Sequence, residues 1–489
     1  MTKKICIVGS GPSGVTAAYA ILKSKNYTVT LLDNSRVLDK LSDAPRVTKR
    51  FLENKYISPK FLFGNASELL EKRFDFISQA DTDKPLIVSN NVAGGHSKIW
   101  GACTPDLDLD DTKDLGIDNR TVRTIEKQII SDIIPSTSIY ELFSLKRDVR
   151  KESYLKTPSG KFYAGLKDSG VDIHYSKVAV NFNKSKKNCT LCGSCIKGCN
   201  YGAIWDASSS IEKLKKYGKK FEYLTDHELI RFEEKQNSVL AFFKTKGSVR
   251  EMNFTKLLIA CGTIPSTRIV SRSLGITGKI RLLHNPFSVS AYITNSLANM
   301  TDKFGLSHHS FELKKCSLSK NFNITFDSST IPEYIISDRL YGPFRLRKTI
   351  SEYINKRSIL VLTYLDSDNS DLWVNVNKER EFSFDENENC EKELYDIKRV
   401  LASKLRKFGF YQLPFSFKVG GLGADLHYGG TIPMTQSINE RPPLYSDNLG
   451  RPNECKNVHV IDGSIINYVP AKNFTKKIMV NSFRIADTL

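Results

Sequence analysis

Long apolar runs are missing from this 489-residue sequence. None approaches the roughly 18 consecutive apolar residues that a membrane-spanning helix needs. A signal peptide is missing as well, because the first apolar run begins at Ile5 and leaves no room for a separate targeting segment. We therefore expect no membrane span and a cytoplasmic location. In that compartment the ten cysteines are expected to be free, metal-bound or redox-active rather than paired in structural disulfides.

Nucleic-acid-binding modules are also missing, although the chain is basic. Lys and Arg number 72 against 53 acidic residues, which gives a formal net charge of +19. The lysines are spread along the chain, so nucleic acid is not expected as a partner. The charge instead favours phosphorylated substrates, acidic membrane surfaces or acidic proteins. The length exceeds that of one hydrophobic core, which predicts two or more domains.

The beginning of the chain contains an apolar run that breaks into a glycine-rich turn, Ile5-Cys6-Ile7-Val8-Gly9-Ser10-Gly11-Pro12-Ser13-Gly14. In order, the three glycines permit a tight turn, a close approach of backbone to a pyrophosphate, and close packing of a helix on the strand. A second apolar run, 29–32, ends at Asp33, which can accept a hydrogen bond from a ribose hydroxyl. This order of elements predicts a bound dinucleotide. The alternative is a glycine turn with a purely structural role.

Four cysteines form the second strong motif, with the spacing C-x2-C-x2-C-x3-C: Cys189, Cys192, Cys195 and Cys199. Thiolates at this spacing can converge on an iron-sulfur cluster. In bacterial ferredoxins, however, the fourth cysteine of such a run ligates a second cluster and precedes proline, whereas Asn200 follows here and no second run exists. The first expectation is one [4Fe-4S] cluster held by all four cysteines. Structural zinc and cysteines without metal are the alternatives.

Apolar periodicity predicts the remaining elements. The strand 257–260 ends at Gly262, in a turn that can close over a nucleotide. Strands dominate from 285 to 413, as in an inserted sheet-based domain. The runs 221–223, 229–232 and 239–243 predict a small antiparallel sheet. The other predicted strands are 171–175, 178–182, 292–294, 310–313, 322–326 and 358–364, and the predicted helices are 15–22, 62–77, 125–134 and 391–408.

Five stretches together resemble the glucose/methanol/choline (GMC) family of FAD-dependent oxidoreductases, and they occur in the family's order: 9–14, 94–100, 260–265, 427–431 and 462–473. The stretch 94–100, followed by Cys103-Thr104-Pro105, is most similar to the pyranose oxidase branch. Some members of that branch attach flavin through a histidine before the tryptophan. Because Ile99 stands there, the resemblance implies noncovalent FAD.

The resemblance implies an α/β fold, in which a discontinuous Rossmann-like FAD-binding domain of the GMC and p-hydroxybenzoate-hydroxylase type accompanies an α+β substrate domain with an antiparallel sheet. The FAD-binding parts would be 1–110, 208–284 and 420–489. The substrate parts would be 111–185 and 285–419, and 186–207 would be a cysteine-rich insertion.

The resemblance also assigns roles to residues whose spacing alone is uninformative. His427 would accept the hydroxyl proton while Asn473 positions the substrate oxygen. Phe474, Lys476 and Lys477 depart from the family's pattern, so the substrate is left open. The implied cofactor-binding residues are Gly9, Gly11, Pro12, Ser13, Gly14, Asp33, Gly94, Gly95, Ser97, Trp100, Gly101, Gly262, Asp462 and Gly463.

The leading function is oxidation of a CH–OH group of a sugar-like or other small alcohol, by a dehydrogenase rather than an oxidase if a cluster exports the electrons. Lys184, Lys186, Lys187 and Lys197 could then dock an acidic electron carrier. Three alternatives stay open: a carrier-fed reductase of a ketone or double bond, a non-catalytic flavin electron-transfer protein, and a sugar-nucleotide or lipid-phosphate binder suggested by charge alone.

Overall fold

The fold is known from a computed structural model and is described for part of the chain. The described residues are 3–35, 74–77, 87–141, 156–182, 188–193, 195, 199–295, 304–313, 321–327, 349–350, 353–354, 356–376, 382–386, 390–414, 416–420, 425–435 and 442–489. Within these ranges, no helix is long and apolar enough to cross a membrane.

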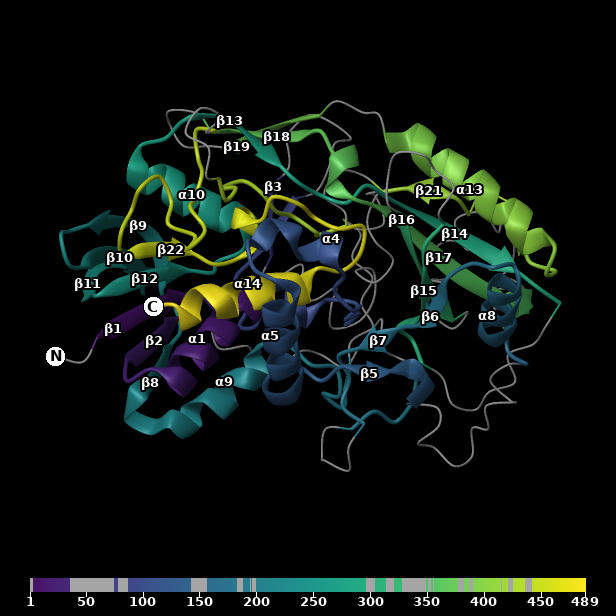
Figure 1. The fold of residues 1–489 in the computed structure, drawn as a ribbon, viewed down its shortest axis with the longest axis horizontal. Helices are drawn as coiled ribbons and strands as arrows, with labels where there is room; N and C mark the ends of the chain where they lie inside the picture. Colours follow the sequence, from purple (N-terminus) through teal and green to yellow (C-terminus); the bar gives the residue numbers. More distant parts are fainter. Residues whose placement is uncertain are drawn as a thin grey trace.

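A five-stranded parallel sheet is built from three separate parts of the chain, in the order β22-β12-β1-β2-β8 (Figure 1). The central strand β1 is apolar and buried from Ile5 to Val8, as is typical of a parallel strand covered on both faces. This sheet confirms the predicted α/β class. Its strands are β1 (Lys4–Val8), β2 (Thr28–Leu32), β8 (Phe221–Leu224), β12 (Lys256–Ile259) and β22 (Val458–Val460).

Helices from opposite ends of the chain pack against each other beside this sheet (Figure 1). They are α1 (Pro12–Ser24), which follows the glycine turn, and α14 (Thr475–Asp487). Helix α5 (Asn119–Asp132) also packs against α14, and its start is capped by Asp118, whose carboxylate accepts a hydrogen bond from the Thr121 N–H at 2.9 Å. The last part of the chain therefore completes the unit that the first strand begins.

The small antiparallel sheet differs from the predicted one in one strand. It contains β9 (Glu228–Glu234), β10 (Val239–Thr245) and β11 (Ser248–Phe254), whereas the predicted strand 221–223 pairs in parallel with β2 instead. Lys246 and Gly247 both have positive φ, +48° and +82°, so a tight turn supplies β11 as the neighbour of β10. Alternation identified the strands at 221–223, 229–232 and 239–243 but not their partners, and β11 was not predicted.

A larger antiparallel sheet forms the second half of the molecule, in the order β20-β14-β17-β16-β15-β6. Helices α8 (Pro158–Asp168) and α13 (Cys390–Arg406) contribute to the hydrophobic core on it. The predicted antiparallel sheet is thereby confirmed. Its strands are β6 (Ile173–Tyr175), β14 (Phe287–Ile293), β15 (Ser307–Phe311), β16 (Asn321–Asp327), β17 (Ser358–Leu365) and β20 (Tyr411–Gln412), and β21 (Lys418–Val419) also pairs with β14.

The predicted helix 62–77 is wrong at its end. Residues 74–77 form strand β3 (Phe74–Ile77), which pairs antiparallel with β4 (Ile87–Asn90), and residues 62–73 lie outside the described part. The sequence Phe-Asp-Phe alternates with period two, which favours a strand over this short stretch. The other elements are η2 (Gly95–Lys98), α4 (Leu109–Thr112), η3 (Lys113–Leu115), β5 (Thr137–Ser138), β7 (Lys177–Val178), α9 (Ser208–Leu214), η5 (Lys215–Lys220), α10 (Thr263–Leu274), β13 (Gly278–Leu282), η7 (Ser367–Asn369), β18 (Leu372–Val376), β19 (Phe382–Glu386) and η8 (Gly463–Ile465).

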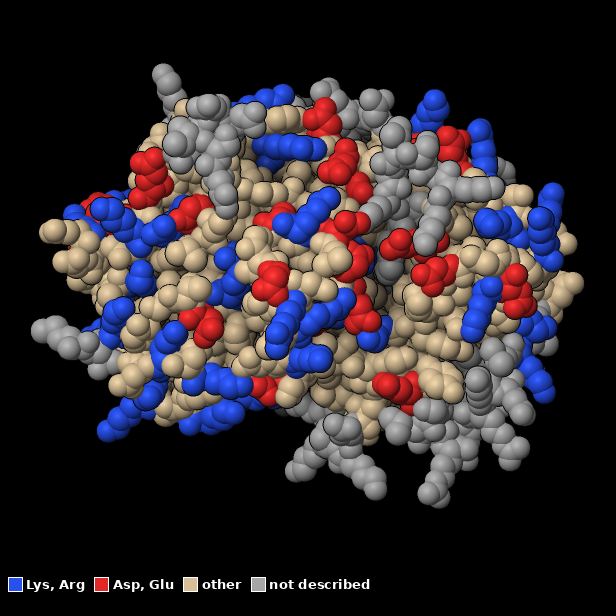
Figure 2. Space-filling view, in the orientation of Figure 1, with Lys and Arg blue, Asp and Glu red and all other residues tan. Residues whose placement is uncertain are grey.

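Charged side chains of both signs are interspersed over the face shown in Figure 2. Lysines and arginines do not gather there into one continuous basic field, which agrees with their even spread along the sequence. The four lysines predicted to dock an acidic carrier, Lys184, Lys186, Lys187 and Lys197, lie outside the described residues.

Candidate functional site

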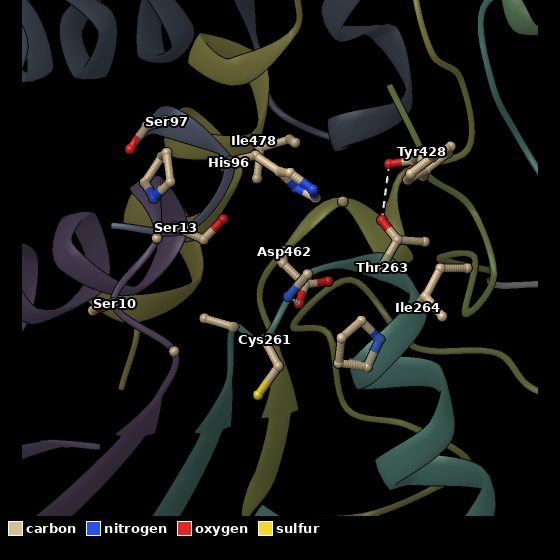
Figure 3. A pocket seen from close by; sticks show the side chains of 18 of the residues that line it. Ser10, Ser13, His96, Ser97, Cys261, Thr263, Ile264, Tyr428, Asp462 and Ile478 are labelled. Carbon is tan, nitrogen blue, oxygen red and sulfur yellow. Dashed lines mark hydrogen bonds between the residues drawn. The ribbon is translucent and has the colours of Figure 1, made fainter. Parts of the chain in front are cut away.

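A cavity of about 380 Å³ lies where strands of the parallel sheet end (Figure 3). The carboxyl edge of a parallel sheet is the general location of ligand sites in open α/β folds. Distant parts of the sequence meet in the cavity wall, which includes residues of 8–13, 33–34, 91–100, 227–229, 260–272, 425–428, 462–463 and 473–478.

The glycine turn borders the cavity, and its three glycines differ in what surrounds them. A Cβ on Gly9, where φ is +102°, would lie 2.2 Å from the Ala260 carbonyl oxygen, and one on Gly14 would lie 1.8 Å from the Gly9 oxygen. A Cβ on Gly11 would meet no described atom within 4 Å. Gly9 and Gly14 are thus required by the fold itself, whereas Gly11 borders open space.

Helix α1 begins at Pro12, and the described residues provide no side-chain cap for it. The first N–H groups of a helix lack intrahelical partners and carry the positive end of the helix dipole. Such a helix start, reached through a glycine turn and lining a cavity, can hold the phosphate oxygens of a nucleotide.

Asp33 lies at the end of β2 with a buried carboxylate that organises the turn. It accepts hydrogen bonds from the backbone N–H groups of Ser10 at 2.9 Å and Ser35 at 2.6 Å, and from the Ser10 hydroxyl. Burial raises the pKa of the Asp33 carboxyl, and these bonds partly oppose that rise. The Ser10 oxygen in turn accepts from the Gly94 N–H at 3.0 Å, which joins the turn to the next wall segment.

Hydrogen bonds to residues 205–208 hold the segment 94–101 in place. The Trp100 ring nitrogen donates to the Trp205 carbonyl at 2.9 Å, and the Ser97 oxygen accepts from the Ala207 N–H at 2.9 Å. Gly94 has a φ of +91°, and a Cβ there would lie 3.0 Å from the Ser208 nitrogen. These anchors present the other side of the segment to the cavity.

Asp462 joins the two remaining turns of the wall. Its buried carboxylate accepts from the Gly262 N–H and the Ser464 N–H, each at 2.9 Å, and from the Ser266 hydroxyl. Burial raises the pKa of Asp462, against the effect of these hydrogen bonds. The carboxylate thereby fixes the start of α10 beside Gly463, which also lines the cavity.

His427 lies in the wall of the same cavity, held between aromatic rings. Its ring centroid is 5.5 Å from that of Tyr364 and 5.6 Å from that of Phe474, which meets it edge-on at 87°. Its Nδ1 atom lies 2.9 Å from the Oδ1 atom of Asn285. The preceding residue, Leu426, has a φ of +60°, an unfavourable conformation of the kind that clusters at functional sites.

Asn473 lines the cavity at the start of α14. Its Oδ1 atom accepts a hydrogen bond from the Thr475 N–H at 3.1 Å. Its NH2 group is therefore the donor end of the side chain. A base and an amide donor in one cavity can act on a single alcohol group, one taking its proton and the other binding its oxygen.

The structure brings most of the predicted site residues to one place. The following predicted residues line the cavity: Gly9, Gly11, Pro12, Ser13, Asp33, Gly95, Ser97, Trp100, Gly262, His427, Asp462, Gly463 and Asn473. Gly14, Gly94 and Gly101 do not line it, and the first two serve the packing of the turns. The chemical roles of all these residues stay predictions.

The four predicted cluster ligands do not form a metal site. In the described ranges, no group of three or more His, Cys, Asp or Glu residues could hold a metal ion. Cys189, Cys195 and Cys199 pack against the hydrophobic core, whereas Cys192 is exposed. Burial raises the pKa of the Cys195 thiol to about 12, and the charges of the other three cysteines add to this rise, so the four thiols lie within electrostatic range of one another. The expectation of a [4Fe-4S] cluster is therefore not supported.

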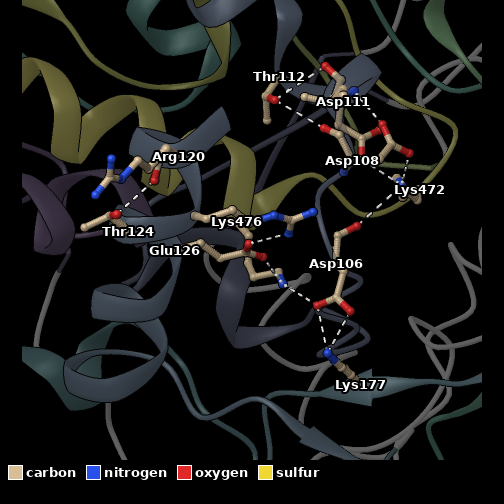
Figure 4. Close-up of polar contacts among 12 residues, drawn as sticks. Asp106, Asp108, Asp111, Thr112, Arg120, Thr124, Glu126, Lys177, Lys472 and Lys476 are labelled. Atoms are coloured by element: carbon tan, nitrogen blue, oxygen red, sulfur yellow. Dashed lines mark hydrogen bonds and ion pairs between the residues drawn. The ribbon is translucent and has the colours of Figure 1, made fainter. Parts of the chain in front are cut away.

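Sequence reasoning missed the residues that support the C-terminal part of the site. Asn285 and Tyr364, beside His427, come from the antiparallel half of the molecule, and no motif marks them. Lys476 pairs with Glu126 at 2.7 Å (Figure 4), and Lys477 pairs with Asp114 at 2.7 Å. The lysines that depart from the family's pattern thus belong to buried ion pairs and do not line the cavity.

The parallel sheet with a cavity at its carboxyl edge, beside an antiparallel sheet, places the chain in the α/β class. No protein-family model and no curated protein sequence matches it. Its fold is similar to the crystal structure of pyridoxine 4-oxidase from Mesorbium loti, with a TM-score of 0.65. The two chains are 12% identical, and the likeness covers 100% of this chain and 99% of the other. At that identity the likeness establishes the fold, and the function has to be argued from the site.

Proposed function

We propose that this chain is an FAD-dependent oxidoreductase that oxidises a CH–OH group of a sugar-like or other small alcohol to a carbonyl. One observation carries the proposal: a single cavity joins a phosphate-binding type of glycine turn to His427 and Asn473, which come from the other end of the chain. The sequence resemblance to the GMC family supports the same class. So does the likeness of the fold to a structure named pyridoxine 4-oxidase.

The cavity fits the dinucleotide part of FAD. The open space beside Gly11 and the uncapped start of α1 suit the pyrophosphate. Asp33, which lines the cavity, would accept a hydrogen bond from a ribose hydroxyl. Gly95, Trp100, Gly262 and Gly463 would line the remainder. FAD, when bound, supplies the hydride acceptor for the reaction.

The chain's own residues handle the proton and the substrate oxygen. The imidazole of His427 takes the hydroxyl proton, and the Asn473 NH2 group holds the same oxygen by a hydrogen bond. Tyr364 and Phe474 fix the plane of the imidazole between them. Substrate specificity would come from the predicted substrate parts, 111–185 and 285–419, of which Tyr364 and Asn285 contact His427.

The test is anaerobic purification followed by absorption spectroscopy while a panel of sugars, alcohols and pyridoxine-like alcohols is added. Flavin bands that bleach with an alcohol support the proposal. A flavin that reduced carriers bleach but no alcohol does would favour the carrier-fed reductase, and purified protein without flavin bands would refute both. Oxygen consumption by the reduced protein separates an oxidase from a dehydrogenase. The expected iron-sulfur cluster was the argument for a dehydrogenase, and that cluster is not supported.

Valine in place of Gly11 tests the pyrophosphate site separately from the fold. The backbone there is extended, with φ −65° and ψ −179°, so valine is compatible with it and its side chain enters the cavity. We expect the unfolding midpoint of flavin-free protein to stay unchanged. FAD binding should weaken about 10- to 100-fold, the equivalent of one lost charge-assisted hydrogen bond of about 1.5–3 kcal/mol.

Alanine in place of Gly14 is the contrasting variant. Its Cβ would collide with the Gly9 carbonyl oxygen inside the fold, so it should lower the unfolding midpoint even without FAD. Fluorescence titration with FAD and urea unfolding measure the two effects. Normal FAD affinity in Gly11→Val would place the pyrophosphate elsewhere.

A further inference from the structure

Asn285 and His427 flank a single antiparallel bridge between their two segments. Leu283 and Gly429 exchange both of their backbone hydrogen bonds at 2.9 Å, as an antiparallel bridge. Two residues further along each segment, Asn285 comes opposite His427. Residues two apart in extended segments point to the same side, which explains why these side chains meet.

The side-chain amide of Asn285 is completely buried, and its orientation is fixed by its neighbours. The NH2 group donates to two backbone carbonyls, that of Leu365 at 2.8 Å and that of Pro470 at 3.0 Å. A carbonyl oxygen can only accept, so the NH2 end of the amide must face these two groups. The opposite orientation would set the amide oxygen against two carbonyl oxygens. The Oδ1 atom is therefore the end that faces His427.

This orientation decides which nitrogen of the imidazole carries the proton. The Asn285 Oδ1 atom lies 2.9 Å from the His427 Nδ1 atom, and an amide oxygen is an acceptor only. Nδ1 must then be the donor. In the neutral ring, a proton on Nδ1 leaves the lone pair on Nε2.

We infer that Asn285 is a positioning residue that holds His427 in the Nδ1–H tautomer, so that Nε2 is the atom that accepts the alcohol proton. The inference rests on the proposed alcohol oxidation, and it adds which atom of His427 accepts the proton. The backbone supports the same arrangement, because the Asn285 N–H donates to the carboxylate of Asp425 at 2.8 Å, two residues before His427. The hydrogen bonds of the Asn285 side chain thus connect His427 to Leu365 at the end of β17 and to Pro470 in the loop before Asn473.

The test combines NMR of ring-15N-labelled histidine in otherwise deuterated protein with the variant Asn285→Leu. His427→Gln identifies the His427 signals by their loss. We expect the wild-type ring to show the Nδ1–H tautomer and the leucine variant to show a mixture or the Nε2–H form. In stopped-flow mixing with an alcohol, flavin reduction in the variant should be about 10- to 100-fold slower, as for other residues that orient a functional side chain. The dissociation constant of the alcohol should change less than about threefold.

Asn323→Leu is the matched control. Asn323 is equally buried and lies in β16 of the large antiparallel sheet, where its Oδ1 atom accepts from the Thr363 hydroxyl. It should lower the unfolding midpoint yet leave the His427 signals and the reduction rate as in the wild type.

A wild-type ring protonated on Nε2, or unchanged His427 signals in Asn285→Leu, would overturn the inference. The ring signals are read without substrate. A failure of the proposed alcohol oxidation would appear instead as a wild-type flavin that no alcohol reduces, so the two failures are distinguishable.

Discussion

Replacing His427 by alanine is expected to slow alcohol-driven flavin reduction about 100- to 10,000-fold, the usual range for loss of a general base. The imidazole faces the cavity that contains the glycine turn, and aromatic rings and Asn285 fix its position. Two other histidines line the same cavity, His96 and His227, but the Asn285 side chain forms its hydrogen bond with His427. Anaerobic stopped-flow absorbance at the flavin band measures the rate.

The matched control is His174→Gln on β6. That histidine is 69% exposed and pairs with Asp172, far from the cavity wall in the register of the antiparallel sheet. It should leave the reduction rate unchanged. FAD content and the unfolding midpoint of His427→Ala should also match the wild type, because the half-buried imidazole contributes little to the core. A reduction rate within threefold of the wild type would show that His427 is not the base.

The parallel half of the fold could be predicted because its signals are local. Strand β1, the glycine turn and α1 follow directly from apolar residues and glycines in consecutive positions, and Asp33 follows β2. The structure adds reasons that the sequence does not contain. Gly9 is required by the Ala260 carbonyl, which comes from a strand hundreds of residues later.

Predictions failed where the partner of a segment decides its role. The strand at 221–224 alternates like its neighbours, yet it pairs with β2 because the turn at Lys246-Gly247 provides β11 to the small sheet. The cysteine spacing suits a cluster, yet the described ranges contain no group of three or more His, Cys, Asp or Glu residues that could hold a metal ion. Spacing along the chain gives the order of side chains but not the direction in which each points.

The residues that support His427 could not have been predicted for the same reason. The bridge between Leu283 and Gly429 brings Asn285 close to His427. Tyr364 lies on β17, which pairs with β14. Neither residue type at either position carries a local signal. The departures Lys476 and Lys477 were visible in the sequence, but their acidic partners lie on two elements, α5 and η3, more than half the chain away.

Replacing Asp114 by asparagine is expected to destabilise the protein by about 3–5 kcal/mol, the range for breaking a buried ion pair. Asp114 lies 2.7 Å from the ammonium group of Lys477, whose side chain is completely buried on α14. The same ammonium donates to the Tyr468 carbonyl at 2.6 Å. Without the carboxylate, this carbonyl and the charge of Asp111 are left to compensate for a buried positive charge. Urea unfolding at neutral pH measures the loss.

The pH dependence of the variant separates lost charge pairing from lost packing. Burial already lowers the pKa of Lys477, and Asp114 opposes that effect, so removing the carboxylate lowers this pKa further. Between the folded-state pKa and the ordinary value of about 10.4, the unfolded chain binds more protons than the folded one. The stability of Asp114→Asn should therefore rise with pH through that window, more steeply than in the wild type.

Two further variants complete the test. Lys477→Met added to Asp114→Asn removes the unpaired charge and should recover most of the stability, because apolar replacements of buried ion pairs are often neutral. Glu212→Gln breaks an exposed pair with Lys215 on α9 and η5, where both side chains are more than half exposed, and should leave the unfolding midpoint unchanged. If the double variant were as unstable as Asp114→Asn, the cost would lie in packing around α14 rather than in the buried ammonium.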